Sequence, residues 1–238
     1  MSGDKPSQMM RSWQANAQAW THVVREQRLP SRRLVTDAAL LEAIEQCSPT
    51  RVLDVGCGEG WLCRALAKKH VEVIGVDASQ PLIMQARAAD PYPQRYHHCA
   101  YDQLAQAGHA LGQFDLLVCN FALLDEVLLP SLKALSTRVT ETGHLLIQTL
   151  HPWQACNGQP YQDGWRVEQF SDFAGEFVEP MPWFFRTLGS WLELLAEAGW
   201  QLQLLREPLH PQQQQPASLL LVLRQCSAGD ADTFEIGK

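Results

Sequence analysis

The sequence predicts an α/β protein with a doubly wound, mostly parallel sheet of seven strands. Short apolar segments typical of strands alternate with helix-like segments from residue 51 onward. This alternation indicates right-handed βαβ units with helices on both faces of the sheet. The last two strand-like segments, 200–208 and 218–226, are separated only by a polar loop. Adjacent strands joined in this way run antiparallel, so we expect the sheet to end in a β-hairpin.

The individual elements follow from the periodicity of the apolar residues. Strands are expected at 51–55, 71–76, 95–100, 114–119, 144–150, 200–208 and 218–226. Helices are expected between them at 60–69, 80–90, 103–110, 124–139 and 187–199. In a sheet of this type, ligands bind at the carboxyl ends of the strands.

Two helices are expected before the first strand. Apolar residues recur at helical spacing from Trp13 to Val24, and a break at 29–31 precedes a second helix at 34–44. Trp13 and Trp20 are seven residues apart, which places them on one face of a helix and is typical of core packing.

The segment 151–186 interrupts the alternation of strands and helices. It is rich in Trp, Phe and Pro and has little periodicity, and a long irregular insert in a compact domain is usually functional. We therefore expect a lid or a substrate-binding segment. The chain then divides into an N-terminal helical unit (1–48), a main domain with this insert (49–226) and a flexible tail (227–238).

The composition disfavours several classes of function. The 238 residues carry a formal net charge of -7, which argues against nucleic-acid binding because surfaces for nucleic acids are basic. No apolar run approaches the roughly 20 residues of a membrane span. The seven cysteines are scattered without a C-x-x-C pair, as expected for reduced thiols of a cytoplasmic protein.

A glycine-rich turn after the first strand is the strongest functional signal. In VLDVGCGEGW, residues 52–61, the glycines fall as G-x-G-x-G at positions 56, 58 and 60, and Asp54 precedes them by two residues. A strand that leads into such a turn and then into a helix presents backbone N–H groups to a ligand. A dinucleotide fingerprint would need its third glycine at position 61, which is Trp61.

The motif DVGCGEG resembles motif I of the class I S-adenosylmethionine-dependent methyltransferases. The resemblance covers roughly residues 40–226 and includes VEVIGVDAS, HCAYDQL, FDLLVCNFAL and the terminal hairpin. It implies a Rossmann-like fold, S-adenosyl-L-methionine as cofactor, S-adenosyl-L-homocysteine as product, and an N-terminal helical lid over the cofactor. The helical N-terminus and the HPW step after the fifth strand look like small-molecule enzymes near the quinone-biosynthesis group.

The resemblance also implies roles for single residues. Asp77 would accept hydrogen bonds from the ribose hydroxyls, Asp102 would face the adenine amino group, and Asn120 would line the methionine end with Phe121. The cofactor-binding candidates are Asp54, Gly56, Cys57, Gly58, Gly60, Asp77, Ala78, Asp102, Asn120 and Phe121.

Several of these residues also have a purely structural explanation. The three glycines could form a tight turn that binds nothing, Asp77 could cap the helix that starts after Ser79, and Asp102 could be an ordinary N-cap. No metal site is expected, because Cys57 and Cys63 have no further ligands beside them.

The acceptor side of the site is less well defined. His151 directly follows the fifth strand and could act as a general base or be a hydrogen-bonded structural histidine. Arg186 could hold a substrate carboxylate bidentately or be a surface arginine. The aromatic residues of the insert are expected to form a wall of the substrate site, and the candidates are Trp153, Trp183 and Phe184.

The predicted function is methyl transfer from S-adenosylmethionine to an O, N or C nucleophile of a small molecule. The sulfonium already activates the methyl group, so the enzyme's main tasks are alignment of the nucleophile and exclusion of water. The alternatives are an NAD(P)-dependent oxidoreductase and a non-catalytic S-adenosylmethionine-binding protein. The sequence is compatible with a monomer or a homodimer.

Overall fold

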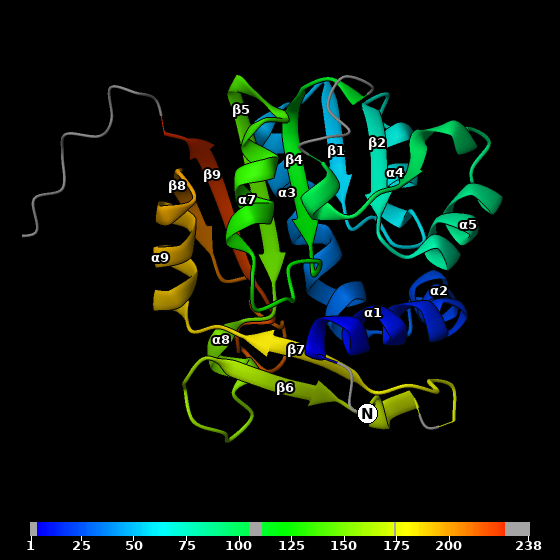
Figure 1. The fold of residues 1–238 in the computed structure, drawn as a ribbon, viewed down its shortest axis with the longest axis vertical. Coiled ribbons are helices and arrows are strands. Elements are labelled where there is room, and N and C mark those ends of the chain that lie inside the picture. The colour runs from blue at the N-terminus through cyan, green and yellow to red at the C-terminus, as the bar shows by residue number, and fades with distance from the viewer. Residues whose placement is uncertain (1–3, 105–110, 174, 227–238) are drawn as a thin grey trace, which may run out of the picture.

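A computed structural model of the protein describes residues 4–104, 111–173 and 175–226, except for the side chain of Asp102 (Figure 1). Seven strands form one sheet in the order β3-β2-β1-β4-β5-β9-β8, and β9 is antiparallel to both of its neighbours. The predicted fold is therefore confirmed. The strands are β1 (Arg51–Val55), β2 (Glu72–Asp77), β3 (Tyr96–His98), β4 (Phe114–Asn120), β5 (Val139–Thr149), β8 (Trp200–Arg206) and β9 (Leu219–Gln225).

Helices cover both faces of this sheet (Figure 1). One face carries α3 (Asp37–Cys47), α4 (Trp61–Ala67) and α5 (Gln80–Ala88). The other face carries α7 (Leu129–Ser136) and α9 (Leu188–Glu197). Successive residues of β9 alternate between the two cores: Leu221 packs with α7 and α9, and Leu220 packs with α3 and α4. A strand that is buried on both faces has a continuous apolar sequence, which explains why the strands could be predicted.

Two predicted element boundaries are wrong. The helix expected at 124–139 is α7, which starts only at Leu129 because Pro130 favours the first turn of a helix. The fifth strand starts at Val139, before the predicted 144. Gly143 continues the strand there because the backbone passes close to β4: a Cβ on Gly143 would lie 2.8 Å from the Asp115 carbonyl oxygen.

The N-terminal helices lie at the carboxyl ends of the strands (Figure 1). They are α1 (Lys5–Ala15) and α2 (Ala17–Arg25), and they meet at Asn16. The expected single helix through Trp13 and Trp20 is therefore broken, although the centroids of the two indole rings lie 5.4 Å apart. Among the described residues no helix has both the length and the apolar character that a membrane span requires.

The insert contains a hairpin that the sequence analysis missed. After α8 (Pro152–Ala155), β6 (Gly164–Glu168) pairs antiparallel with β7 (Met181–Phe185). The two strands lack the short turn that marks a hairpin in a sequence. Between them, Phe170 and Phe177 pack against the Trp20 ring, so the hairpin and the N-terminal helices share one aromatic cluster.

Part of the prediction concerns residues outside the described ranges. These are most of the helix expected at 103–110 and the tail at 227–238.

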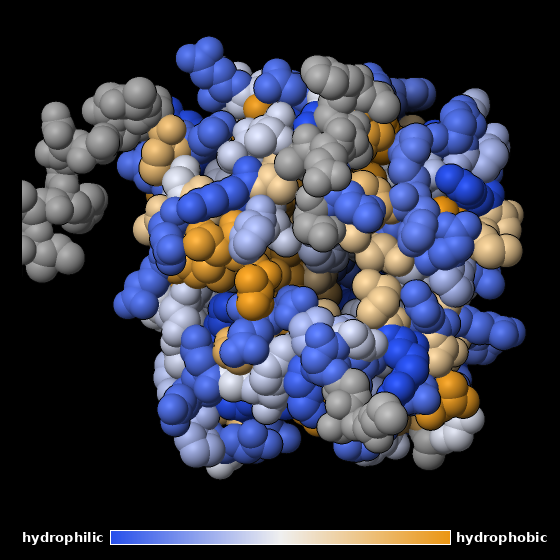
Figure 2. All heavy atoms as spheres, viewed as in Figure 1, coloured by the Kyte–Doolittle hydropathy of each residue, from blue (hydrophilic) through white to orange (hydrophobic). Residues whose placement is uncertain are grey.

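Over the face shown in Figure 2, apolar side chains gather between α7 and α9. The surface is hollowed above α1, near the carboxyl ends of β1 and β4.

Candidate functional site

The glycine turn after β1 has a backbone that only glycine adopts easily. Gly56, Gly58 and Gly60 have φ angles of +79°, +55° and +84°. A Cβ on Gly56 would lie 2.5 Å from the Ala122 Cβ, and a Cβ on Gly60 would lie 2.8 Å from the Tyr96 ring. A Cβ on Gly58 would meet no atom within 4 Å. The first and third glycines therefore allow close packing, and the second borders open space.

Asp77 ends β2 beside this turn. Its Oδ2 accepts a hydrogen bond from the Gly58 N–H at 2.8 Å, and its Oδ1 accepts one from the Ser79 N–H at 2.7 Å. Burial raises the pKa of the Asp77 carboxyl, and these two hydrogen bonds oppose the rise. The contact with Ser79 forms a turn before α5 and does not cap the helix, because Ser79 is itself the N-cap residue. Each carboxylate oxygen keeps a further acceptor position for a ligand hydroxyl.

Asp54 lies within β1 and is only 2% exposed. Its Oδ2 accepts a long hydrogen bond from the Cys63 thiol, at 3.5 Å. Burial raises the pKa of the Asp54 carboxyl from 3.8 to about 7. Among the described residues no cation forms an ion pair with it. The site therefore contains a buried acid without a paired positive charge.

Arg32 is a residue of the site that the sequence analysis missed. It opens a π-helical segment, Arg32–Thr36, and such segments are frequent at functional sites. Its Nε donates to Asp37 Oδ1 at 2.9 Å, and its guanidinium lies 4.8 Å from the Trp61 ring centroid. The Arg32 charge lowers the pKa of Asp54, and its Nη2 is buried without a hydrogen-bond partner in the described part of the chain.

Asn120 and Phe121 lie where β4 ends, as predicted. Phe121 has φ +51°, which is rare for a bulky residue, and its N–H donates to the Gln148 carbonyl at 2.7 Å. Asn120 Oδ1 is buried and accepts no hydrogen bond from the described residues. Strained backbone concentrates at functional sites. Ala122, the next residue, lies against Gly56, so the loop after β4 starts at the glycine turn.

The remaining cofactor candidates are placed less directly. The Cys57 thiol packs near Gly75 of β2, so this residue can offer a ligand only its backbone. The Ala78 carbonyl is hydrogen-bonded to His98 Nε2 at 3.0 Å. The backbone of Asp102 lies in a 3-10 turn, Tyr101–Gln103, but its side chain is outside the described residues.

Glu59, inside the glycine motif, connects the turn to an N-terminal helix. Its side chain is 3% exposed. One carboxylate oxygen accepts a hydrogen bond from Arg25 Nε of α2 at 2.7 Å, and both oxygens accept from Arg64 Nη2 at 2.8 and 2.7 Å. The position of α2 is therefore tied to the conformation of the turn.

Asn16 connects the N-terminal helices to the hairpin in the same way. Its side chain is almost fully buried. Its Oδ1 accepts hydrogen bonds from the Val178 and Glu179 N–H groups at 2.8 and 3.3 Å, and its Nδ2 donates to the Glu179 carbonyl at 2.6 Å. The α1–α2 junction is thus bonded to the segment that leads into β7.

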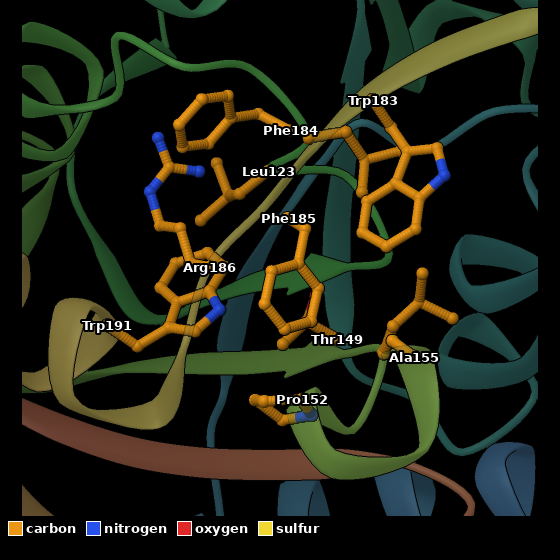
Figure 3. A pocket seen from close by; sticks show the side chains of 11 residues that line it. Leu123, Thr149, Pro152, Ala155, Trp183, Phe184, Phe185, Arg186 and Trp191 are labelled. Atoms are coloured by element: carbon orange, nitrogen blue, oxygen red, sulfur yellow. The ribbon is translucent and has the colours of Figure 1, made fainter. Parts of the chain in front are cut away.

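An aromatic pocket lies between the loop after β4, the end of β7 and the start of α9 (Figure 3). Arg186 is 6% exposed, and its guanidinium lies 4.8 Å from the Phe184 ring centroid and 5.4 Å from that of Trp191. The structure brings together three of the predicted substrate residues, Trp183, Phe184 and Arg186. The pocket is lined by Leu123, Leu124, Thr149, Leu150, Pro152, Ala155, Trp183, Phe184, Phe185, Arg186 and Trp191.

His151 and Trp153 lie apart from this group. His151 Nε2 is 2.7 Å from Glu207 Oε1, and Trp153 is 73% exposed. Both line a second, apolar pocket with Tyr161. Glu207 follows β8, the strand at the sheet edge on the side away from β1. His151 Nδ1 is buried and makes no hydrogen bond to the described residues, so the general base and the structural histidine both stay predictions.

Comparisons with known proteins identify the central part of the chain. Residues 52–143 match the family model of the methyltransferase domain. This segment therefore carries the signature of a methyltransferase domain. The chain is 31% identical over 107 residues to the ubiquinone biosynthesis O-methyltransferase of Acinetobacter baylyi, and the match covers 42% of this chain and 44% of that protein. The chain thus matches less than half of the length of this curated relative.

The methyltransferase domain also resembles solved structures. A putative S-adenosylmethionine-dependent methyltransferase from Listeria monocytogenes superposes with a TM-score of 0.65 at 19% identity, covering 81% of this chain and 100% of that chain. The 1,6-didemethyltoxoflavin-N1-methyltransferase of Burkholderia thailandensis, solved with S-adenosylhomocysteine and 1,6-didemethyltoxoflavin, gives 0.63 at 18% identity, covering 95% and 93%. At these identities the likeness concerns the fold alone.

Proposed function

We propose that the protein transfers a methyl group from S-adenosylmethionine to a small-molecule acceptor. The observation that carries this proposal is a set of buried polar atoms around the glycine turn that make no hydrogen bond to the described residues. They are Ser79 Oγ after β2, Asn120 Oδ1 at the end of β4, and Arg32 Nη2 near Trp61. Because buried polar atoms are nearly always hydrogen-bonded, this set fits a polar ligand beside Gly58.

The chemistry of S-adenosylmethionine matches these residues. Asp77 would bind the ribose hydroxyls, and Arg32 would bind the methionine carboxylate with its free Nη2. The buried acid Asp54 favours a cationic ligand, and the cofactor carries an ammonium and a sulfonium. When bound, the cofactor supplies a methyl group already activated by the sulfonium. Asp102 remains the candidate for the adenine amino group.

The chain's own contributions are alignment and exclusion of water, which can lower a barrier by about 7–11 kcal/mol. The N-terminal helices, predicted as a lid over residues 1–48, suit this task. They are bonded to the glycine turn through Glu59 and to the hairpin through Asn16. Closure over the cofactor and closure over the acceptor would therefore occur together.

The aromatic pocket is the proposed acceptor site. The loop after β4 connects the two halves of the site, since Ala122 lies against Gly56 and Leu123 lines the pocket. The ubiquinone relative is named an O-methyltransferase and the toxoflavin enzyme an N1-methyltransferase. We propose an O, N or C acceptor, in that order. No nucleic-acid partner is proposed, because the net charge is -7.

Thermal unfolding with S-adenosylhomocysteine, S-adenosylmethionine and NAD(H) tests the cofactor. A ligand at about 100 times its Kd should stabilise the wild type by about 2.7 kcal/mol, a rise in Tm of about 5–10 °C. Asp77→Asn should lose this rise. Asp115→Asn is the matched control, because Asp115 hydrogen-bonds Thr50 at the opposite end of the sheet. A rise with NAD(H) instead would support the oxidoreductase and refute the proposal.

Methyl transfer from labelled S-adenosylmethionine to a panel of phenols, amines and activated carbon acids tests catalysis. Cofactor binding without transfer to any acceptor would support a non-catalytic binding protein instead.

We also propose a cytoplasmic location, because all seven cysteines are free thiols in the structure. Light scattering would distinguish a monomer from a homodimer.

A further inference from the structure

The acceptor pocket contains a buried cation that no carboxylate of the described residues contacts directly. Arg186 is 6% exposed, and in the described part of the chain no carboxylate forms an ion pair with its guanidinium. Its Nη2 donates to the Glu126 carbonyl at 2.5 Å. The Glu126 carboxylate itself accepts a hydrogen bond from the Trp165 indole at 3.0 Å. Glu126 therefore contacts Arg186 through its backbone carbonyl and not through its carboxylate.

Nη1 of Arg186 is the group that lacks a partner. It is buried and makes no hydrogen bond to the described residues. The Phe184 and Trp191 rings lie over the guanidinium at 4.8 and 5.4 Å and restrict its orientation. In Figure 3 the guanidinium lies beside Phe184 and Leu123, among the side chains that line the pocket. A fixed guanidinium edge with free N–H groups is the arrangement that binds carboxylates.

Arg166 shows what a structural arginine of the same hairpin looks like. Its guanidinium also lies over an aromatic ring, 3.8 Å from the Phe185 centroid. Its Nη1 donates to the Ala155 and Cys156 carbonyls at 2.7 and 2.9 Å, and its Nη2 donates to the Pro160 carbonyl at 3.1 Å. Both terminal nitrogens of Arg166 are therefore bonded to protein, in contrast to Nη1 of Arg186.

We propose that Arg186 binds a carboxylate of the methyl acceptor, so that the acceptor is a carboxylic acid. This inference rests on the proposed function and specifies its substrate class. The carboxylate would accept hydrogen bonds from Nη1, the nitrogen that the described residues leave without a partner. Burial lowers the pKa of the Arg186 guanidinium, and the charges of Asp163, Asp125 and Glu126 oppose this shift only in part.

Calorimetric titration with benzoate and with benzamide, its neutral isostere, tests the proposal. The wild type saturated with S-adenosylhomocysteine should bind benzoate about 10- to 100-fold more tightly, the range expected for a hydrogen bond to a charged group. Arg186→Met should reduce this ratio to about one, and Arg186→Lys should keep part of it. Arg166→Met is the matched control and should keep the whole ratio.

Equal affinities for the two probes in the wild type, or no saturable benzoate binding, would overturn the proposal. So would loss of the preference in Arg166→Met to the same degree as in Arg186→Met. Ligand-free thermal unfolding gives a second readout: Arg186→Met should keep or raise the Tm, and Arg166→Met should lower it. A drop with Arg186→Met as large as with Arg166→Met would assign Arg186 a structural role. The Tm shift with S-adenosylhomocysteine is measured on the same samples, so failure of the proposed function is seen separately.

Discussion

Replacing Asp54 with asparagine should stabilise the ligand-free fold while it weakens cofactor binding. The amide has the same shape, and Asp54 is 2% exposed with the Cys63 thiol as its one hydrogen-bond donor among the described residues. Burial raises the pKa of Asp54 from 3.8 to about 7. At about 1.36 kcal/mol per pH unit, ionised Asp54 destabilises the native state by about 4 kcal/mol above pH 7.

The sign of the pH dependence follows from the direction of the shift. Because the folded pKa lies above the unfolded value, the native state holds the proton while the unfolded state loses it. The contribution of Asp54 to stability is therefore complete below about pH 4 and is lost as the pH rises through 7. The stability gain of Asp54→Asn over the wild type should grow by about 2–3 kcal/mol between pH 5 and pH 8.

Urea unfolding of both proteins at pH 5, 6, 7 and 8, without ligand, measures this gain. Asp115→Asn is the control of opposite sign, because the hydrogen bond from the Thr50 hydroxyl lowers the pKa of Asp115. That variant should lose stability at neutral pH. A pH-independent difference between Asp54→Asn and the wild type would refute the reasoning and would mean that Asp54 is compensated in the folded state. Binding of S-adenosylhomocysteine to Asp54→Asn should be weaker at pH 8.

Two further predictions concern the glycine turn and the N-terminal helices. Gly60→Ala should lower the unfolding free energy by about 2–4 kcal/mol, because residue 60 has a positive φ and its Cβ would lie 2.8 Å from the Tyr96 ring. Gly58→Ala should lower the unfolding free energy by only about 1–2 kcal/mol. It should nevertheless weaken S-adenosylhomocysteine binding more than tenfold. Equal losses of stability in urea unfolding would contradict this assignment. Asn16→Ala should cost about 2–3 kcal/mol through the lost hydrogen bonds to Val178 and Glu179, and hydrogen exchange should then increase in α1, α2 and β7 together. Unchanged exchange in β7 would show that the lid and the hairpin are independent.

The cofactor side of the site could be predicted from the sequence because its determinants are local. The three positive φ angles are encoded by glycine at positions 56, 58 and 60, and Asp77 comes directly at the end of an apolar strand. The strands β1, β4 and β9 are nearly continuous apolar runs because they are buried on both faces. The hairpin of the insert lacks this signal, since β6 is only partly buried and most of its residues are polar or exposed.

The acceptor side depends on contacts between distant segments. Arg186 is buried because Glu126, 60 residues earlier, accepts its hydrogen bond and because Trp191 of α9 covers it. The glycine motif alone does not predict that Glu59 connects the turn to α2, because its partner Arg25 lies 34 residues earlier in that helix. Arg32 has no signal in the sequence either, since a π-helical turn follows from tertiary packing and not from residue type.

Two buried charges of opposite sign, Asp54 and Arg186, lie on the two sides of the proposed site, and neither forms an ion pair within the described residues. A buried unpaired charge destabilises a fold, so each is retained at a cost in the ligand-free protein. Under the two proposals, a cationic methyl donor at Asp54 and an acidic acceptor at Arg186 would offset this cost when they bind. The loop after β4 joins the two charges, because Ala122 lies at the glycine turn and the Glu126 carbonyl bonds Arg186. A change in this loop would therefore affect donor and acceptor binding together, whereas a change in Asp54 or Arg186 affects its own ligand first.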